Sequence, residues 1–369
     1  MTDTAIKKTP LNAAHRALGA RMVEFGGWEM PVQYKGIIEE HNAVRQRVGI
    51  FDTCHMGEFV VQGTGTLPLL QYSTSNDVSK LDLGQAQYSF MTNPEGGVED
   101  DCLVYRFPDH HYVVVNAAPL ESDFQRLSRL ADEQKIGDVV LRNFSDETGK
   151  LDVQGPLAAA LVQKFTDTDL AELKYYYATQ GPIGGVPCRI SRTGYTGEDG
   201  FELFFPMVEV ERMWNLFVEA GAEPCGLGCR DTLRLESSLP LSGSDVSPDP
   251  ARNPICAGFG RFVRLDKDSD FCGKDALQRF KDDGCAQKMI NFEVTGRGVA
   301  RAHYPIADKD GETVGEVTSG APAPSLGRNV GMGWVRPDLA EVGTELAVMI
   351  RDQPVAIRVM KRPMYKRSK

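Results

Sequence analysis

The amino-acid sequence predicts an α+β protein of several domains that ends in an all-β domain. The chain has 369 residues, whereas a single hydrophobic core stops growing at about 250–300 residues. Its 37 glycines show no collagen period and indicate many turns, and therefore many strands. From Lys288 onward, glycine turns separate short alternating segments, among them NFEVTGRG, NVGMGWV and VAIRVM. Regular short strands of this kind predict a small all-β domain.

Periodic patterns place the elements of the first half of the chain in order. Residues 36–49 carry apolar side chains on one helical face, and His41 on that face is expected to be a hydrogen-bonded core histidine. A strand (GEFVVQG) and a short helix (LPLLQYS) follow. The segment QAQYSFMTNPEGGVEDDCLVYRF predicts a hairpin, because residues 93–97 are dense in turn-forming types. The strand HYVVVNAA and a helix over residues 120–135 come next.

The second half begins with the strands VVLRNFS and KLDVQG. Gly155-Pro156 then opens a helix, since proline suits the first helical turn. VPCRISRTGYTGEDGFELFF reads as a strand, a glycine-rich turn and a second strand. Helical spacing recurs in residues 210–217, and GCRDTLRLESS predicts another short helix.

Composition and charge exclude several classes of protein. The 41% apolar and 25% charged residues are ordinary for a soluble globular chain. The net charge of −10 argues against nucleic acid as the main partner. No apolar run approaches the ~20 residues that cross a bilayer, and the N-terminus lacks a signal-peptide h-region. The eight cysteines are scattered without zinc spacing, so we expect free thiols, no metal and a cytoplasmic location.

Carboxylates next to glycine turns are the first candidates for chemistry. Asp100 and Asp101 follow a Gly-Gly turn at the start of a strand, where adjacent side chains point to opposite faces. We therefore expect one of them to face a pocket, although a solvated strand entry fits equally well. Glu202 starts an apolar strand, and its carboxylate could accept two parallel hydrogen bonds from an amidine-like edge. A pairing of Glu202 with a nearby arginine is the alternative.

The remaining charged residues carry a weaker signal. Arg230, Asp231 and Arg234 share one short helix, where local ion pairs are the simplest interpretation. The turn TGYTGEDGFE has neither a dinucleotide fingerprint nor a Walker lysine, so a phosphate or nucleotide site is not expected there. No Ser-His-Asp or Cys-His arrangement stands out.

Taken in order, these segments resemble the glycine cleavage T-protein family of aminomethyltransferases. The resemblance rests on GARMVEFGGWEMPVQY, EEHNAVRQRVGIFDTCHMGEF, YSFMTNPEGGVEDDCLVY, SRTGYTGEDGFEL, GLGCRDTLRLE, FCGKDAL, TSGAPAPSLGRNV and the tail RPMY. It covers residues 19–365, nearly the whole chain. Cys54 stands where family members often have serine, and the segment from Ser242 to Phe262 is less typical of the family.

The resemblance implies a three-domain cloverleaf around a central folate channel, with mostly antiparallel sheets and flanking helices. The first domain would comprise residues 1–53 and 140–245, and the second residues 54–139 and 246–285. Residues 286–369 would form the all-β C-terminal domain.

The resemblance also implies roles for individual residues. Asp101 corresponds to the catalytic carboxylate of the family, and Arg301 to an arginine that could keep it ionised. Glu202 corresponds to the carboxylate that reads the pterin edge. Further folate-binding positions would be Arg230, Tyr195, Tyr88, Tyr105, Asn116, Met56 and Tyr365.

The implied reaction moves a methylene unit from aminomethyl-lipoyl H-protein to tetrahydrofolate. Its products would be 5,10-methylenetetrahydrofolate, ammonia and dihydrolipoyl H-protein. Lipoylated H-protein is thus the expected partner and tetrahydrofolate the expected acceptor, with no nucleic acid, membrane, metal or nucleotide involved. A related folate-dependent demethylase and a folate-binding regulatory protein are the alternatives, because substrate specificity lies in the site and not in the fold.

Overall fold

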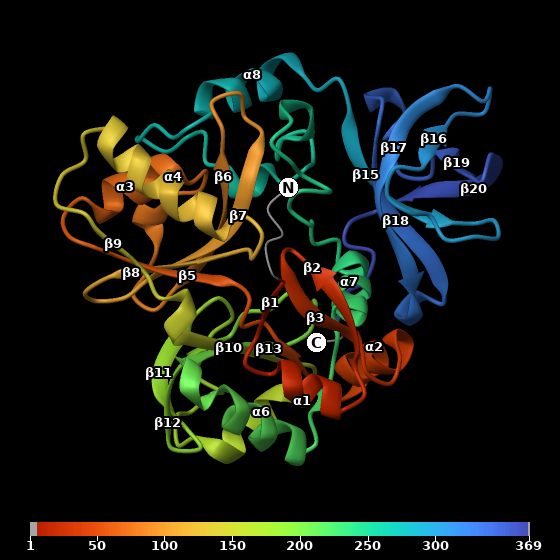
Figure 1. Ribbon diagram of the computed structural model, residues 1–369. Helices are drawn as coiled ribbons and strands as arrows, with labels where there is room; N and C mark the ends of the chain where they lie inside the picture. The colour runs from red at the N-terminus through yellow and green to blue at the C-terminus, as the bar shows by residue number, and fades with distance from the viewer. Residues whose placement is uncertain (1–5, 368–369) are drawn as a thin grey trace. The chain divides into compact units, whose positions relative to one another are not determined.

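The computed structural model describes residues 6–367, which form two compact units that alternate along the chain. Unit 1 comprises residues 6–67, 80–87 and 103–230. Unit 2 comprises residues 68–79, 88–102 and 231–367. The α+β class with mostly antiparallel sheets and an all-β C-terminal domain is confirmed (Figure 1). The three-domain boundaries stay a prediction.

A six-stranded sheet forms the centre of unit 1. Its strand order is β11-β12-β13-β10-β4-β14. All neighbours are antiparallel except β14 and β4, which run parallel. The strands are β4 (Gly49–Asp52), β10 (Thr148–Gln154), β11 (Ala178–Ile183), β12 (Val186–Ser191), β13 (Gly200–Pro206) and β14 (Glu223–Pro224).

One face of this sheet is apolar and is covered by helix α6 (Val210–Glu219). The helix buries Val210, Met213, Trp214 and Phe217 at the spacing that the sequence predicted. Leu151 and Val153 of β10 belong to the same core, as do Phe201, Leu203 and Phe205 of β13. Because side chains alternate along a strand, the residues between them point to the opposite face.

Further helices lie in unit 1, and the last of them, α7, continues into unit 2. Helix α2 (Ile37–Gln46) matches the predicted helix, and Glu40 in its first turn accepts hydrogen bonds from the backbone N–H groups of residues 34–36. His41 is buried there, as expected. The remaining helices are α1 (Asn12–Ala17), α4 (Leu120–Glu133), α5 (Ala158–Val162) and α7 (Leu227–Glu236). Single 3-10 turns span Ser145–Glu147, Gln163–Phe165 and Met207–Glu209.

Two further sheets involve the N-terminal half. A five-stranded sheet has the order β6-β7-β8-β5-β9, with β5 (Gly57–Gln62), β6 (Ala86–Thr92), β7 (Val98–Arg106), β8 (His111–Val115) and β9 (Val140–Asn143). The hairpin of β6 and β7 is the one predicted from the turn at residues 93–97. A small sheet of β1 (Lys7–Lys8), β3 (Trp28–Gln33) and β2 (Arg21–Phe25) was not predicted.

The C-terminal part of unit 2 is a closed antiparallel barrel, drawn in blue in Figure 1. Its order is β15 (Lys288–Val294), β18 (Arg328–Val335), β17 (Thr313–Ala323), β16 (Pro305–Ala307), β19 (Glu345–Ile350) and β20 (Gln353–Met360). Phe292 fills space over Gly331, where a Cβ atom would lie 2.3 Å from the ring. Any larger residue at position 331 would therefore displace the core.

The rest of unit 2 packs around a second core. Phe90, Leu235 and Phe259 belong to it, together with Trp334 of the barrel. Helices α3 (Thr66–Ser73) and α8 (Lys274–Asp283) lie in this part of the chain. Its 3-10 turns span Val78–Lys80, Pro250–Arg252, Gly260–Phe262, Pro324–Leu326 and Pro337–Leu339.

The expectation that all eight cysteines are free thiols was wrong. Cys256 and Cys285 form a disulfide, although 29 residues separate them in the sequence. The other six cysteines are free and buried. Spacing gave no hint of the pair, because the contact is made only when the chain that follows α8 returns to the loop that carries Cys256.

Candidate active site

The second face of the six-stranded sheet carries buried charges. Lys150 and Asp152 alternate with core residues along β10, and Glu202 on β13 pairs in register with Asp152. Lys150 and Asp152 have no exposed surface, and Glu202 is 5% exposed. Burial of charge is costly unless each charge is paired and hydrogen-bonded. This face therefore has to satisfy its charges internally.

Lys150 lies between the two carboxylates. Its Nζ donates to Asp152 Oδ1 at 2.7 Å, to Glu202 Oε1 at 2.6 Å and to Thr53 Oγ1 at 3.2 Å. Burial disfavours the ammonium, but Asp152 and Glu202 outweigh it and raise the pKa of Lys150. The side chain is thus a lysine cation with all three donors used.

Arg230, at the start of α7, completes the charge network. Its Nη1 donates to Asp152 Oδ2 at 2.9 Å, and its guanidinium lies 5.1 Å from the centre of the Tyr195 ring. Burial opposes ionisation of Asp152, but Lys150 and Arg230 together lower its pKa. Arg230 and Tyr195 are half-buried and form the accessible rim of the network.

Glu202 uses its second oxygen on a set of hydroxyl groups. The Thr193 hydroxyl donates to Glu202 Oε2, and Ser191 links Thr193 to the phenol of Tyr105. Burial, followed by the charge of Glu202, raises the pKa of Tyr105 well above its usual value. Met56 packs in the apolar cluster that contains Tyr105. Both Glu202 oxygens are held, and each keeps a lone-pair direction for a further donor.

Asn116 lies at the edge of the five-stranded sheet. Gly57 of β5 pairs with Val115 of β8 in an antiparallel register. Met56 precedes Gly57 and Asn116 follows Val115, so the two residues flank the same end of the strand pair. Both are half-buried.

Asp101 lies in unit 2 on the hairpin of β6 and β7. Its Oδ2 accepts a hydrogen bond of 2.7 Å from the hydroxyl of Tyr88. Burial alternates from Val98 to Leu103, with Asp100 buried and Asp101 half-buried. The prediction that the two carboxylates point to opposite faces is confirmed. The ring of Tyr88 packs at 4.8 Å against that of Phe262.

Two further predicted residues of unit 2 make hydrogen bonds with other partners. The exposed Arg301 donates to the carbonyl of Gly320 and forms no ion pair with Asp101 within residues 6–367. The backbone N–H of Tyr365 donates to the carbonyl of Glu236. Among the predicted residues, the structure thus shows contacts within a Glu202 group in unit 1 and between Asp101 and Tyr88 in unit 2.

Sequence reasoning missed Lys150, Asp152 and Thr193. The segment KLDVQG was correctly interpreted as a strand, but its charges were not singled out. Two opposite charges at positions i and i+2 of an otherwise apolar strand were the available signal, because such residues share one face. Their partner Glu202 comes from a strand 52 residues away in the sequence.

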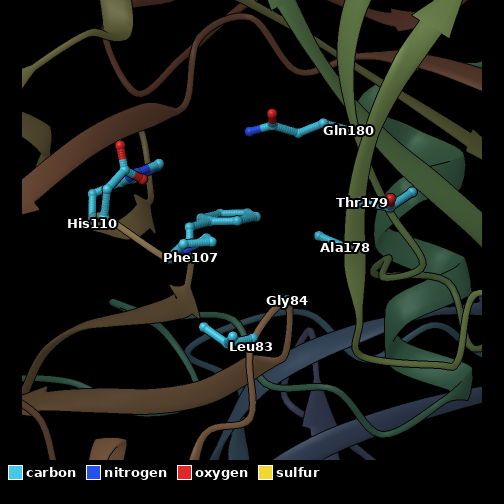
Figure 2. Close-up of a pocket in the computed structure, with 9 residues that line it drawn as sticks. Leu83, Gly84, Phe107, His110, Ala178, Thr179 and Gln180 are labelled. Carbon is cyan, nitrogen blue, oxygen red and sulfur yellow. The ribbon is translucent and has the colours of Figure 1, made fainter.

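A separate pocket of about 590 Å³ opens elsewhere in unit 1. Figure 2 shows Phe107 and His110 on one side and Ala178, Thr179 and Gln180 of β11 on the other. Arg189 donates to His110 Nε2 at 3.1 Å, and its guanidinium lies 4.4 Å from the centre of the Phe107 ring. The pocket contains none of the residues predicted for the site.

Residues 6–367 contain no cluster of three or more His, Cys, Asp or Glu side chains arranged to hold a metal ion. In the same part of the chain, no helix has the length and apolar character needed to span a membrane.

Comparison with known proteins relates the chain to one family over almost its full length. The family described as GCVT N-terminal domain matches residues 11–267, and the glycine cleavage T-protein C-terminal barrel domain matches residues 287–366. The aminomethyltransferase of Desulfitobacterium hafniense (strain Y51) is 46% identical over 99% of this chain and 100% of that protein. The aminomethyltransferase of Geobacillus sp. (strain WCH70) is 45% identical, with the same coverage.

A solved structure agrees with these relatives. The crystal structure of glycine cleavage system aminomethyltransferase T from Bartonella henselae superposes with a TM-score of 0.91 at 31% identity, covering 98% of this chain and 99% of that one. The chain therefore belongs to the glycine cleavage T-protein family of aminomethyltransferases.

Proposed function

We propose that this aminomethyltransferase takes its one-carbon unit from an aminomethyl group on the lipoyl arm of the H-protein. Tetrahydrofolate, which the family uses, is the acceptor. The sulfur–carbon and carbon–nitrogen bonds of the aminomethyl group break, and the carbon forms bonds to two folate nitrogens. The products are ammonia, dihydrolipoyl H-protein and 5,10-methylenetetrahydrofolate. We expect the reaction to occur in the cytoplasm, without a metal or a nucleotide.

Glu202 is the proposed acceptor for the donor edge of the pterin. The observation that carries this role is a buried carboxylate held on both oxygens, by Lys150 and by the Thr193 hydroxyl. A carboxylate fixed in this way can accept parallel N–H donors without first having to be ordered. Tyr195 with Arg230 above it offers a flat aromatic surface next to this network. Tyr105, Asn116, Met56 and Tyr365 are proposed to line the folate as well.

Asp101 is the proposed catalytic carboxylate. Cleavage at the aminomethyl carbon develops positive charge on that carbon, and a fixed carboxylate stabilises such charge. The hydroxyl of Tyr88 orients Asp101 through a hydrogen bond of 2.7 Å. The same carboxylate can receive a proton from a folate nitrogen as the new bond forms. Arg301 forms no ion pair with Asp101 within residues 6–367, so it is proposed to favour the ionised form of Asp101 only through its longer-range charge.

An assay of ammonia release tests the proposed donor and acceptor. The full chain is mixed with tetrahydrofolate and with aminomethylated, lipoylated H-protein from a preparation that another aminomethyltransferase accepts. The proposal expects ammonia release that depends on both substrates. No release contradicts it. Demethylation of an N-methyl, O-methyl or S-methyl compound instead would identify a demethylase, and folate binding without turnover would indicate a regulatory protein.

Folate binding tests Glu202 separately. Replacing Glu202 by Gln keeps the shape of the side chain but removes the charged acceptor, so binding of tetrahydrofolate should weaken by about 1–3 kcal/mol. Isothermal titration calorimetry measures the change. Glu209→Gln, in the 3-10 turn before α6, serves as the matched control. An unchanged affinity of the Glu202 variant would place this residue outside the folate site.

A further inference from the structure

The buried lysine on β10 has no role in the reaction described so far. Lys150 is fully buried, and its three donors reach Asp152, Glu202 and Thr53. No N–H remains for a substrate. Its raised pKa also keeps it protonated, so the amine has no free electron pair with which to attack a one-carbon unit. Lys150 therefore does not act as a nucleophile or as a direct ligand.

The position of Lys150 instead fixes the orientation of the Glu202 carboxylate. The 2.6 Å contact from Lys150 fixes Oε1, while the Thr193 hydroxyl fixes Oε2. Lys150 is itself held by Asp152, which Arg230 anchors at 2.9 Å. The orientation of Glu202 thus depends on a chain of contacts that begins at the rim of the site.

The charges of this network balance. The cations Lys150 and Arg230 face the carboxylates of Asp152 and Glu202. The other titratable groups near them are Glu58, His55, Tyr105, Asp52 and Arg189. Burial raises the pKa of Glu58 well above its usual value, which disfavours its charged form, and lowers that of His55 to about 4, so His55 is neutral near pH 7. Asp52 is paired with His15 at 2.9 Å. Arg189 stacks at 3.9 Å over the ring of Tyr112.

We propose that Lys150 is a positioning residue that orients Glu202 and supplies the opposite charge that this buried carboxylate needs, so that folate binding stays independent of pH near neutrality. This inference rests on the proposed role of Glu202. Without the ammonium, the buried carboxylates of Asp152 and Glu202 would be left with Arg230, which contacts Asp152. The less costly state is then one in which a carboxyl takes up a proton. A protonated Glu202 presents a donor where the ligand also presents donors.

The test compares two variants that separate charge from packing. Lys150→Met removes the cation and leaves Asp152 and Glu202 facing Arg230 alone. The double variant Lys150→Met with Asp152→Asn removes one charge of each sign and restores the balance. Lys164→Met, on an exposed 3-10 turn, is the control. The dissociation constant of tetrahydrofolate is measured by calorimetry at pH 6, 7 and 8 on folded protein.

The wild-type chain, the Lys164 control and the double variant should show flat profiles over this range. The dissociation constant of Lys150→Met alone should rise as the pH falls from 8 to 6, because protonation of a carboxyl that has lost its cation removes an acceptor for the ligand. Any titration of the ligand itself appears equally in the wild-type profile.

If Lys150 were purely structural, both variants would lose thermal stability but their dissociation constants would not change with pH. A dissociation constant of Lys150→Met that is the same at pH 6 and pH 8 therefore overturns the proposal. A pH dependence that persists in the double variant also overturns it, because charge balance is then not the cause. If Glu202→Gln leaves folate affinity unchanged, the proposed role of Glu202 fails instead. If Glu202→Gln weakens binding but the affinity of Lys150→Met does not change with pH, only the proposed role of Lys150 fails.

Discussion

His55 shows how burial changes the chemistry of a single side chain. It is 4% exposed, and its Nδ1 has no hydrogen-bond partner among residues 6–367. Burial lowers the pKa of His55 from 6.5 to about 4. The folded protein therefore holds this imidazole neutral at pH values where the unfolded chain would protonate it.

Acidification destabilises the folded protein through His55. The unfolded state binds more protons at His55 between pH 6.5 and 4, so the free energy of unfolding falls as the pH is lowered through this window. Replacing His55 by Leu should make the loss between pH 7 and 4.5 smaller by about 2–3 kcal/mol. Urea unfolding at both pH values measures it. His303→Leu controls for the loss of an exposed imidazole. If the free energy of unfolding falls by the same amount in the His55 variant and in the wild type, the proposed effect of His55 is wrong.

The residues of the site were predicted in part from their local sequence. Alternation along a strand was enough to place Asp100 and Asp101 on opposite faces, because that depends on neighbouring positions only. The partner of Glu202 could not be predicted. The sequence suggested an arginine, whereas the structure supplies Lys150, and that contact depends on the pairing of β10 with β13.

At the scale of the element, a buried lysine from a distant segment, Lys267, caps the C-terminal end of helix α3. Lys267 Nζ donates to the carbonyls of Gln71, Thr74 and Asn76 at 2.6, 2.8 and 2.9 Å. Carbonyl groups at a helix C-terminus lack partners within the helix, and Lys267 supplies donors to them although burial lowers its pKa to about 7.

Replacing Lys267 by Met should lower the free energy of unfolding by about 3 kcal/mol, because three buried carbonyls lose their donor. Urea denaturation followed by circular dichroism measures the change, and hydrogen exchange of the α3 amides locates it. Lys281→Met, on the exposed side of α8, is the matched control. A Lys267 variant as stable as this control would show that water replaces the ammonium at no cost.

Elements with a clear period were predicted well. The sequence located α2, α4 and α6 and the hairpin of β6 and β7 within a few residues, since each has an amphipathic pattern or a dense turn. The small sheet of β1 to β3 and helix α8 were not predicted. Strand β1 has only two residues, and α8 is strongly charged on its outer side. Long-range caps such as Lys267 on α3 span 196 residues and leave no local pattern.

At the scale of the whole molecule, the alternating segments after Lys288 predicted an all-β domain, and that domain is present. Closure into a barrel was not predicted, because it depends on the pairing of β15 with β20, which lie at opposite ends of the domain. The sequence predicted free thiols and missed the Cys256–Cys285 disulfide for the same kind of reason. Both features are set by tertiary proximity and not by spacing.

The thiol count of the protein tests the disulfide. A sample purified without reductant and then unfolded should react with a thiol reagent at six cysteines, and at eight after reduction. Because the bond closes a loop of 29 residues, reduction should also lower the free energy of unfolding by about 3–4 kcal/mol. Cys256→Ser with Cys285→Ser should lose its sensitivity to reductant. If eight thiols react without prior reduction, the protein does not form the Cys256–Cys285 disulfide.

We propose that Asp101 acts in the chemical step whereas Glu202 acts in binding, and one variant separates the two proposed roles. Asp101→Asn should keep the affinity for tetrahydrofolate within about twofold, while ammonia release from aminomethylated H-protein falls by about 10²-fold or more. Glu99→Gln, which shares the half-buried face of β7, should retain turnover. Turnover in Asp101→Asn equal to that of the wild-type chain would contradict the account.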